Sequence, residues 1–147
     1  MVLLRIKSIY YTGAVNPDAI SQAESEMSKM IMVVDDSPAI RQLICFSMEN
    51  AGYEVLEASD GQFALEKLEA GQAQLVITDL NMPNFNGIEL IKTLRAMPSY
   101  KFTPIIMLTT ESQMSKVKEG KAAGATGWIV KPFDPEHLVA VVNKLLG

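Results

Sequence analysis

Short apolar runs alternate with amphipathic segments along most of the chain. Five runs have the length and near-continuous apolar character of buried strands: 30–35, 53–58, 74–78, 104–108 and 127–130. Apolar residues at helical spacing follow each run and predict five helices: 37–50, 61–70, 87–97, 112–122 and 135–145. This alternation with short connections is typical of an α/β fold, in which helices cover both faces of a parallel sheet.

Local signals indicate where the first helix begins and ends. Ser37 suits the N-cap, Pro38 suits the first helical position, and Gly52 suits the end. The spacing of the apolar residues predicts three inward-facing sets: Ile40, Leu43, Ile44 and Ser47; Ala64, Leu65 and Leu68; and Leu138, Val141, Val142 and Leu145.

Residues 1–29 differ from the remainder of the chain. They show no clear periodicity, and their stretch ISQAESEMSK is polar and loop-like. We expect 1–29 to be an N-terminal extension, flexible or non-native, and 30–147 to form one domain. An ordered extra element that packs on this domain remains the alternative.

Composition narrows the class of protein. The formal net charge of -4 and the pI of about 5.0 argue against non-specific binding to nucleic acid or to anionic membranes. No apolar run is long enough to span a bilayer, and Arg5 and Lys7 interrupt the apolar N-terminal stretch. The single cysteine, Cys45, lies in a helical apolar pattern and is expected to be buried. We expect a cytoplasmic protein.

Chemically active side chains follow four of the five predicted strands. The first strand ends at Asp35 and Asp36, the third at Asp79, the fourth at Thr109 and the fifth at Lys131. Because the carboxyl ends of parallel strands meet at one edge of the sheet, we expect these side chains to converge there.

Such a cluster suits phosphoryl transfer to a carboxylate. Carboxylates a few ångströms apart repel one another, and a hard cation such as Mg²⁺, with its preference for oxygen ligands, removes that repulsion. Lys131 adds a positive charge that can pair with Asp79 or with a phosphoryl oxygen, and Thr109 can donate a hydrogen bond to that oxygen. Positioning and charge neutralisation then do most of the catalytic work.

Each of these residues also has a purely structural interpretation. Asp35 and Asp36 could cap the following helix, and Asp79 could form an Asx-turn. Thr109 could be an ordinary strand-end hydroxyl, and Lys131 a solvated charge. Their combined placement after successive strands favours the site. The only histidine, His137, is expected at the surface of the last helix.

Four stretches together resemble the receiver domain of two-component response regulators: VVDDSPAIRQ, VITDLNMPNFNGIEL, PIIMLTTES and AGATGWIVKPF. The resemblance covers 30–147 and is strongest to the single-domain chemotaxis type. It implies a flavodoxin-like (βα)5 fold, a doubly wound parallel five-stranded sheet with strand order 2-1-3-4-5.

The resemblance also implies a role for each matched residue. Asp79 would accept the phosphoryl group. Mg²⁺ would be bound by Asp36, Asp79 and the backbone carbonyl of Asn81, with Asp35 assisting. Thr109 and Lys131 would contact the phosphoryl oxygens, and Trp128 would be the aromatic residue that switches. Asn81 and Glu111 would tune dephosphorylation. The resemblance also implies that the peptide bond between Lys131 and Pro132 is cis.

The function implied is a phosphorylation-activated signalling switch and not an enzyme, apart from self-dephosphorylation. The expected partners are a sensor histidine kinase (CheA-like), a flagellar motor switch protein or other phospho-dependent target, and a phosphatase. We expect a monomer that binds neither nucleic acid nor membrane. Three lysines could supply charge to the partner face or simply be solvated: Lys116, Lys118 and Lys121. A phosphate sink or a phosphorelay intermediate would have the same acidic site.

Rival classes fit the sequence less well. An aspartyl-nucleophile phosphohydrolase usually carries a second acid two residues after the nucleophile, where this chain has Asn81. A flavin-binding domain needs a phosphate loop after the first strand, and DDSPAI is acidic instead. No helix-turn-helix follows Gly147, so we expect no binding to DNA.

Overall fold

The structure is a computed structural model that describes residues 29–82 and 84–147. Its strands are β1 (Met30–Val34), β2 (Glu54–Ala58), β3 (Leu75–Asp79), β4 (Ile105–Thr110) and β5 (Gly127–Lys131). Its α-helices are α3 (Pro38–Asn50), α4 (Gly61–Ala70), α5 (Gly87–Ala96), α6 (Val117–Ala123) and α7 (Pro135–Leu146). Two 3-10 helices, η1 (Pro98–Tyr100) and η2 (Glu111–Lys116), flank β4. All strand pairs are parallel and the sheet order is β2-β1-β3-β4-β5, which confirms the predicted fold.

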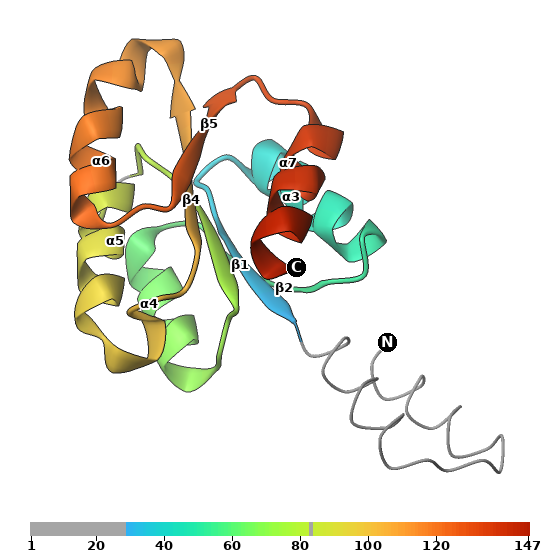
Figure 1. Ribbon diagram of the computed structural model, residues 1–147, viewed down its shortest axis with the longest axis horizontal. Helices are drawn as coiled ribbons and strands as arrows, with labels where there is room; N and C mark the ends of the chain where they lie inside the picture. The colour runs from blue at the N-terminus through green and yellow to red at the C-terminus, as the bar shows by residue number, and fades with distance from the viewer. Residues whose placement is uncertain (1–28, 83) are drawn as a thin grey trace, which may run out of the picture.

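The helices form one layer on each face of the sheet (Figure 1). Helices α3 and α7 cover one face, and α4, α5 and α6 cover the other. Successive residues of β1 enter different cores: Ile31 and Val33 pack with α3 and α7, while Met32 and Val34 pack with α4 and α5. All five positions of β3 are buried. Burial on both faces explains why the strands are near-continuously apolar.

Side-chain caps fix the helix starts at the carboxyl edge of the sheet. Ser37 accepts a hydrogen bond from the backbone N–H of Ile40, as predicted for α3. Asp60 caps α4 in the same way, and Asn86 and Glu89 form a reciprocal capping box on α5. Each cap satisfies backbone donors that would otherwise lack partners. The strand-to-helix connections at this edge are therefore short and well defined.

The predicted inward faces are partly wrong. Ala64, Leu65 and Leu68 are buried as predicted. In α3, however, Leu43 is 41% exposed, and Ile44, Cys45 and Met48 form the buried stripe. In α7, Leu145 is 36% exposed, and Leu138 and Val142 are the buried pair. Helical spacing identifies an apolar stripe, but the contacts with the sheet and the neighbouring helix decide which residues lie at its centre.

The single α-helix predicted at 112–122 is only partly correct. Residues 111–116 form η2, and only the shorter α6 is α-helical. Thr110 and Gln113 form a capping box at the start of η2, but no residue of this 3-10 helix is buried. Packing therefore supplies no preference for α-helical geometry before Val117.

The predicted extension is 1–29, of which residues 1–28 lie outside the described residues, so the structure does not test this prediction. Lys29 is described: its Nζ donates to the carbonyl of Leu146 at 3.0 Å, and its carbonyl accepts from the N–H of Glu54 at 3.1 Å. Cys45 is buried, as predicted. Among the described residues, none of the helices has the length and apolar character needed to cross a membrane.

We expect Gly87→Ala to destabilise the protein, because α5 begins in direct contact with the end of β3. A Cβ on Gly87 would lie 2.3 Å from the backbone oxygen of Asp79, which cannot move without disturbing the sheet. The expected loss is about 2–3 kcal/mol of unfolding free energy, measured by urea denaturation with circular dichroism. Gly127→Ala is the control, because a Cβ there meets nothing within 4 Å. Equal stability of the two variants would contradict this account.

Candidate functional site

Three carboxylates converge at the carboxyl edge of the sheet, as the sequence predicts. One carboxylate oxygen each from Asp35, Asp36 and Asp79 lies within 4.8 Å of the others. Asp35 and Asp79 follow adjacent strands and are 0% and 5% exposed, whereas Asp36 is exposed. Two buried acids side by side need compensating charge.

Lys131 supplies part of this charge from the end of β5. Its Nζ lies 2.9 Å from Oδ2 of Asp35 and 3.3 Å from Oδ1 of Asp79. The ammonium therefore bridges both buried acids, whereas the sequence analysis proposed a pair only with Asp79. The peptide bond between Lys131 and Pro132 is cis, in agreement with the resemblance.

The balance of charges shifts two pKa values. Burial, followed by the charge of Asp35, raises the pKa of Asp79 to about 6, although the Lys131 ion pair and the N–H of Asn81 act in the opposite direction. Burial alone would lower the pKa of Lys131. The hydrogen bond to Asp35 and the charges of Asp79 and Asp35 outweigh that effect and raise it. One ammonium therefore does not fully compensate the cost of burying the ionised carboxylate of Asp79, and its pKa stays raised.

Arg41, which the sequence analysis did not identify, holds the loop after β1. Its Nη1 donates to the backbone oxygen of Asp35 at 2.6 Å, and its Nε pairs with Glu57 at 3.0 Å. The N–H of Ser37 donates to Oδ1 of Asp35 at 2.9 Å. Arg41 lies four residues after the N-cap of α3, one turn into the helix. This position was the only feature of the sequence that could have indicated its contact with the loop after β1. It orients Asp35 without joining the acid cluster.

The side-chain hydroxyl of Thr109 is unusual among buried polar groups in its hydrogen bonding. It is 0% exposed, and its Oγ1 has no hydrogen-bond partner among the described residues. By contrast, Oγ1 of buried Thr78 donates to the backbone oxygen of Asp79 at 2.9 Å. Leaving a buried hydroxyl unpaired costs about 1–3 kcal/mol, so this orphaned group suits a ligand oxygen.

The residues predicted to tune dephosphorylation lie at the rim. Asn81 and Glu111 are both exposed, and the backbone N–H of Asn81 donates to Oδ1 of Asp79 at 3.5 Å. His137 is exposed on α7, as predicted.

Trp128 lies on the surface of β5. It is 38% exposed, and Nζ of Lys121 lies 5.0 Å from the centroid of its ring, which is cation–π geometry. Lys116 and Lys118 are exposed nearby on η2 and α6, and Lys116 pairs with Glu119 at 3.8 Å. The three lysines are therefore accessible, as both interpretations of them require.

The acid cluster fits a hard divalent cation. Its ligand atoms are all carboxylate oxygens, it retains excess negative charge beside one ammonium, and exposed Asp36 leaves one side open to solvent. The chemistry of the donor set is therefore that of a magnesium or calcium site and not of a thiolate or imidazole site.

Comparison with known proteins agrees with this geometry. The model of the response regulator receiver domain matches residues 31–143, so the chain belongs to that family. Within it, the chain is CheY-like: it is 44% identical over 119 residues to chemotaxis protein CheY1 of Helicobacter pylori strain J99, covering 80% of this chain and 96% of that protein. The CheY homolog of Campylobacter jejuni is 40% identical, with 80% and 92% coverage. The solved structure of chemotaxis response regulator CheY4 of Vibrio cholerae has a TM-score of 0.76 at 47% identity, covering 80% of this chain and 98% of that one.

Membership of this family defines the general function. CheY-like receiver domains act in phosphorylation-dependent signalling and are not enzymes in the usual sense. They receive their signal from a histidine kinase and pass it to a downstream target.

We expect Asp79→Asn to stabilise the protein when no metal is bound. An acid whose pKa is raised in the folded state, here from 3.8 to about 6, contributes stability at low pH and loses it as the pH rises through that range. The full loss is about 2–3 kcal/mol, so the variant should gain about 1–3 kcal/mol at pH 7.5.

Urea unfolding in EDTA at pH 5 and pH 7.5 measures this gain. The gain should be smaller at pH 5, where wild-type Asp79 is partly protonated. Replacing the exposed Glu69 with Gln is the control and should change little at either pH. A variant less stable than wild type at pH 7.5 would mean that the ion pair with Lys131 outweighs the burial of charge.

Proposed function

We propose that the chain is a phosphorylation-activated switch that accepts a phosphoryl group on Asp79 from a sensor histidine kinase. It then binds a downstream protein, the flagellar motor switch being the first candidate. The observation that carries this proposal is the placement of Lys131 between two buried carboxylates at the sheet edge where β4 ends with the unpartnered hydroxyl of Thr109.

Asp79 is the nucleophile. Its pKa of about 6 leaves it mainly ionised at neutral pH in the absence of metal, so a carboxylate oxygen is available for attack. The new bond joins this oxygen to phosphorus as the bond from phosphorus to the histidine nitrogen of the kinase breaks. The electron pair of the broken bond remains on the imidazole. No external base is needed, because the carboxylate has already lost its proton.

Asp36, Asp79 and the backbone carbonyl of Asn81 would hold Mg²⁺, with Asp35 assisting. The support for this assignment is the closeness of the three carboxylates and the absence of any softer ligand in the group. When bound, the ion neutralises charge on the carboxylates and on the phosphoryl oxygens.

Lys131 and Thr109 stabilise the phosphorylated form. The ammonium already lies 3.3 Å from Asp79, so it can shift to a phosphoryl oxygen while it keeps its contact with Asp35. Thr109 gains the hydrogen bond that its hydroxyl lacks. Asn81 and Glu111, at the exposed rim, control the access of water or a phosphatase and so tune dephosphorylation.

The output is a population shift across β4 and β5. As Thr109 is drawn toward the phosphoryl group, Trp128 moves from its exposed position, and the face formed by α6, β5 and α7 binds the partner. Lys116, Lys118 and Lys121 make this face attractive to an acidic partner segment. The chemotaxis relatives favour the motor switch as the target.

Phosphorylation is tested by intact mass after incubation with Mg²⁺ and acetyl phosphate. We expect wild type to gain one phosphoryl group and Asp79→Asn to gain none, because the proposal assigns Asp79 as the only acceptor. Asp134→Asn, at an exposed cap of α7, is the control and should be modified normally. Omission of Mg²⁺ should abolish the adduct. An adduct that persists in Asp79→Asn would overturn the assignment of the acceptor.

Motor control is tested by deleting the gene in the source organism and scoring the swimming reversals of single cells. We expect the deletion to abolish chemotactic reversals, wild type to restore them, and Asp79→Asn to fail. Glu69→Gln, which alters only an exposed residue of α4, should restore them. Normal reversals in the deletion strain, with phosphorylation of Asp79 intact, would favour a phosphate sink or relay.

A further inference from the structure

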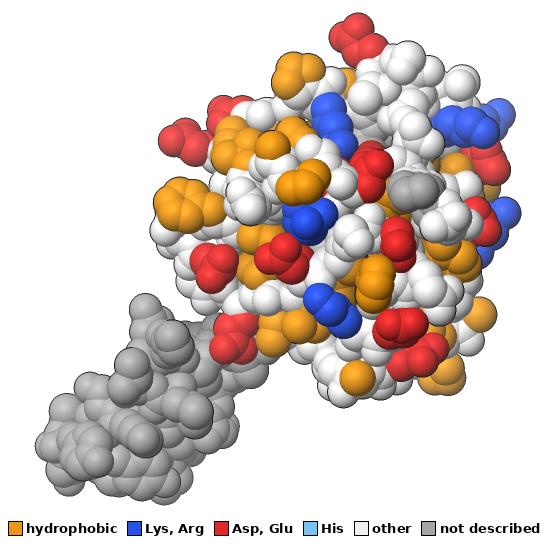
Figure 2. Space-filling view, turned by 180° about the vertical axis from the view of Figure 1, so that it is seen from behind, with side chains coloured by type: hydrophobic (Ala, Val, Ile, Leu, Met, Phe, Trp, Pro, Cys, Tyr) orange, Lys and Arg blue, Asp and Glu red, His pale blue; other side chains and the backbone are white. Residues whose placement is uncertain are grey.

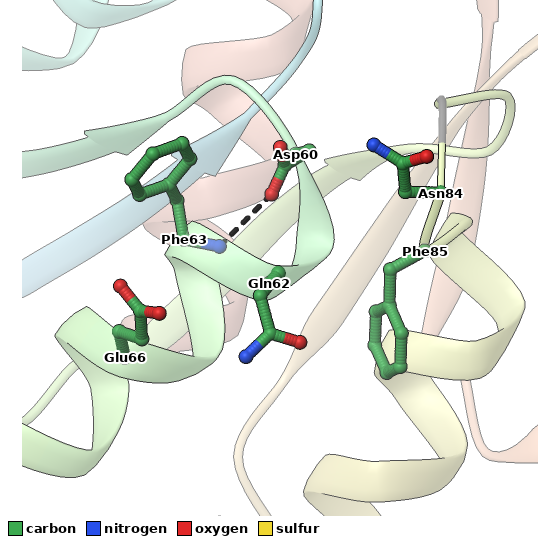
Figure 3. A pocket seen from close by; sticks show the side chains of 6 residues that line it. All are labelled: Asp60, Gln62, Phe63, Glu66, Asn84 and Phe85. Carbon is green, nitrogen blue, oxygen red and sulfur yellow. Dashed lines mark hydrogen bonds between the residues drawn. The ribbon is translucent and has the colours of Figure 1, made fainter.

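A cavity lies between the start of α4 and the loop after β3 (Figure 3). Its volume is about 290 Å³. Its lining residues are Asp60, Gln62, Phe63, Glu66, Asn84 and Phe85 (Figure 3). None of them belongs to the proposed phosphoryl site, and they lie away from the α6–β5–α7 face.

Two carboxylates in this cavity lack a cationic partner. No Lys or Arg among the described residues pairs with Asp60 or Glu66. Oδ1 of Asp60 accepts the N–H of Phe63 at 2.9 Å, which offsets the positive end of α4 and leaves its other oxygen available. Lys67, the nearest lysine in sequence, instead donates to the backbone oxygen of Glu57. The cavity therefore presents uncompensated negative charge.

Two aromatic rings form its apolar walls. Figure 3 shows Phe63 and Phe85 on opposite sides of Gln62. Phe85 is fixed, because its ring lies against Gly61: a Cβ on that glycine would be only 2.3 Å from Cδ1 of the ring. Phe63 is 53% exposed and stands at the opening. The two rings together give the cavity an apolar surface on which a planar cationic group can lie.

The wider surface has the same character. Residues 30–74, which include α3, β2 and α4, carry eight acidic and two basic side chains, whereas residues 75–147 carry six and eight. The formal net charges are therefore -6 and +2. Figure 2 shows acidic, basic and apolar side chains interspersed on one face of the domain. The segment that supplies Asp60, Gln62, Phe63 and Glu66 to the cavity is therefore acidic, which favours a cationic occupant.

We propose that the cavity receives an arginine side chain from a basic segment of a partner protein. A guanidinium can lie on the face of a phenyl ring and pair with a carboxylate through parallel N–H groups, a combination that lysine does not match. Apolar residues next to the arginine would cover Phe63. This surface is separate from the proposed output face, so one domain can hold two partners at once.

The test uses the full chain labelled with ¹⁵N and a short peptide that has one arginine next to leucine. The matched peptide carries citrulline, the neutral isostere of arginine. We expect the arginine peptide to shift the amide signals of Phe63, Asn84 and Phe85 with millimolar affinity. The citrulline peptide should bind at least fivefold more weakly, because it lacks the charge.

Variants localise the effect. Glu66→Gln and Phe63→Ala should each weaken binding about fivefold to tenfold. Glu69→Gln, three residues after Glu66 on the same helix and outside the cavity lining, should leave binding unchanged. Equal binding of both peptides, or shifts confined to Asp35, Asp36 and Asp79, would overturn the proposal. A second result would also overturn the proposal. If the full-length variant Arg5→Gln/Lys7→Gln, without peptide, differs from wild type in the amide signals of Phe63, Asn84 and Phe85, the occupant is the chain's own N-terminal segment.

Discussion

The pairing of one ammonium with two buried carboxylates is the interaction on which the site depends. Strand order makes it possible, because β1 and β3 are neighbours and place Asp35 and Asp79 side by side. Lys131 reaches both from the end of β5, across the end of β4. Burial, followed by the charge of Asp35, raises the pKa of Asp79 despite the ion pair, and the arrangement remains one positive charge short. A site with surplus negative charge attracts a divalent cation and is most stable when it holds one.

The surroundings of this cluster are held by backbone contacts and caps. Arg41 and the N–H of Ser37 bind opposite ends of Asp35, and Gly87 lets α5 begin against the carbonyl of Asp79. These contacts fix the directions in which the carboxylates point. Fixed carboxylates do not need to reorganise when charge moves on to them, and such preorganisation is a major source of catalytic power.

Much of this structure could be predicted from the sequence, because a strand that is buried on both faces consists almost entirely of apolar residues. Strands such as β3 are apolar throughout, and the polar residue that ends each strand stands out against that background. The same signal located Asp79, Thr109 and Lys131 at one edge. A helix that is buried on one face only is harder to orient from its sequence. Leu43 and Leu145 were therefore predicted to face inward, and both are exposed.

Features that depend on contacts between distant segments could not be predicted. The cavity at Phe63 and Phe85 exists because a phenyl ring from one loop packs on a glycine of another element, and neither residue is unusual in its own segment. The bridge from Lys131 to Asp35 joins residues 96 positions apart. Sequence spacing places both at an edge but does not measure the distance between them.

The position of Trp128 indicates how small a force the proposed switch needs. Trp128 pairs in register with Met107, and Thr109 lies two residues further along β4, so their side chains share one side of the sheet. The indole is only partly buried, at 38% exposure, and its contact with Lys121 is worth about 0.5–1 kcal/mol at an exposed site. The hydrogen bond that Thr109 lacks is worth about 1 kcal/mol or more when its partner is charged. The two energies are comparable, so phosphorylation of Asp79 can shift the population of Trp128 by about fivefold or more without any change in the sheet.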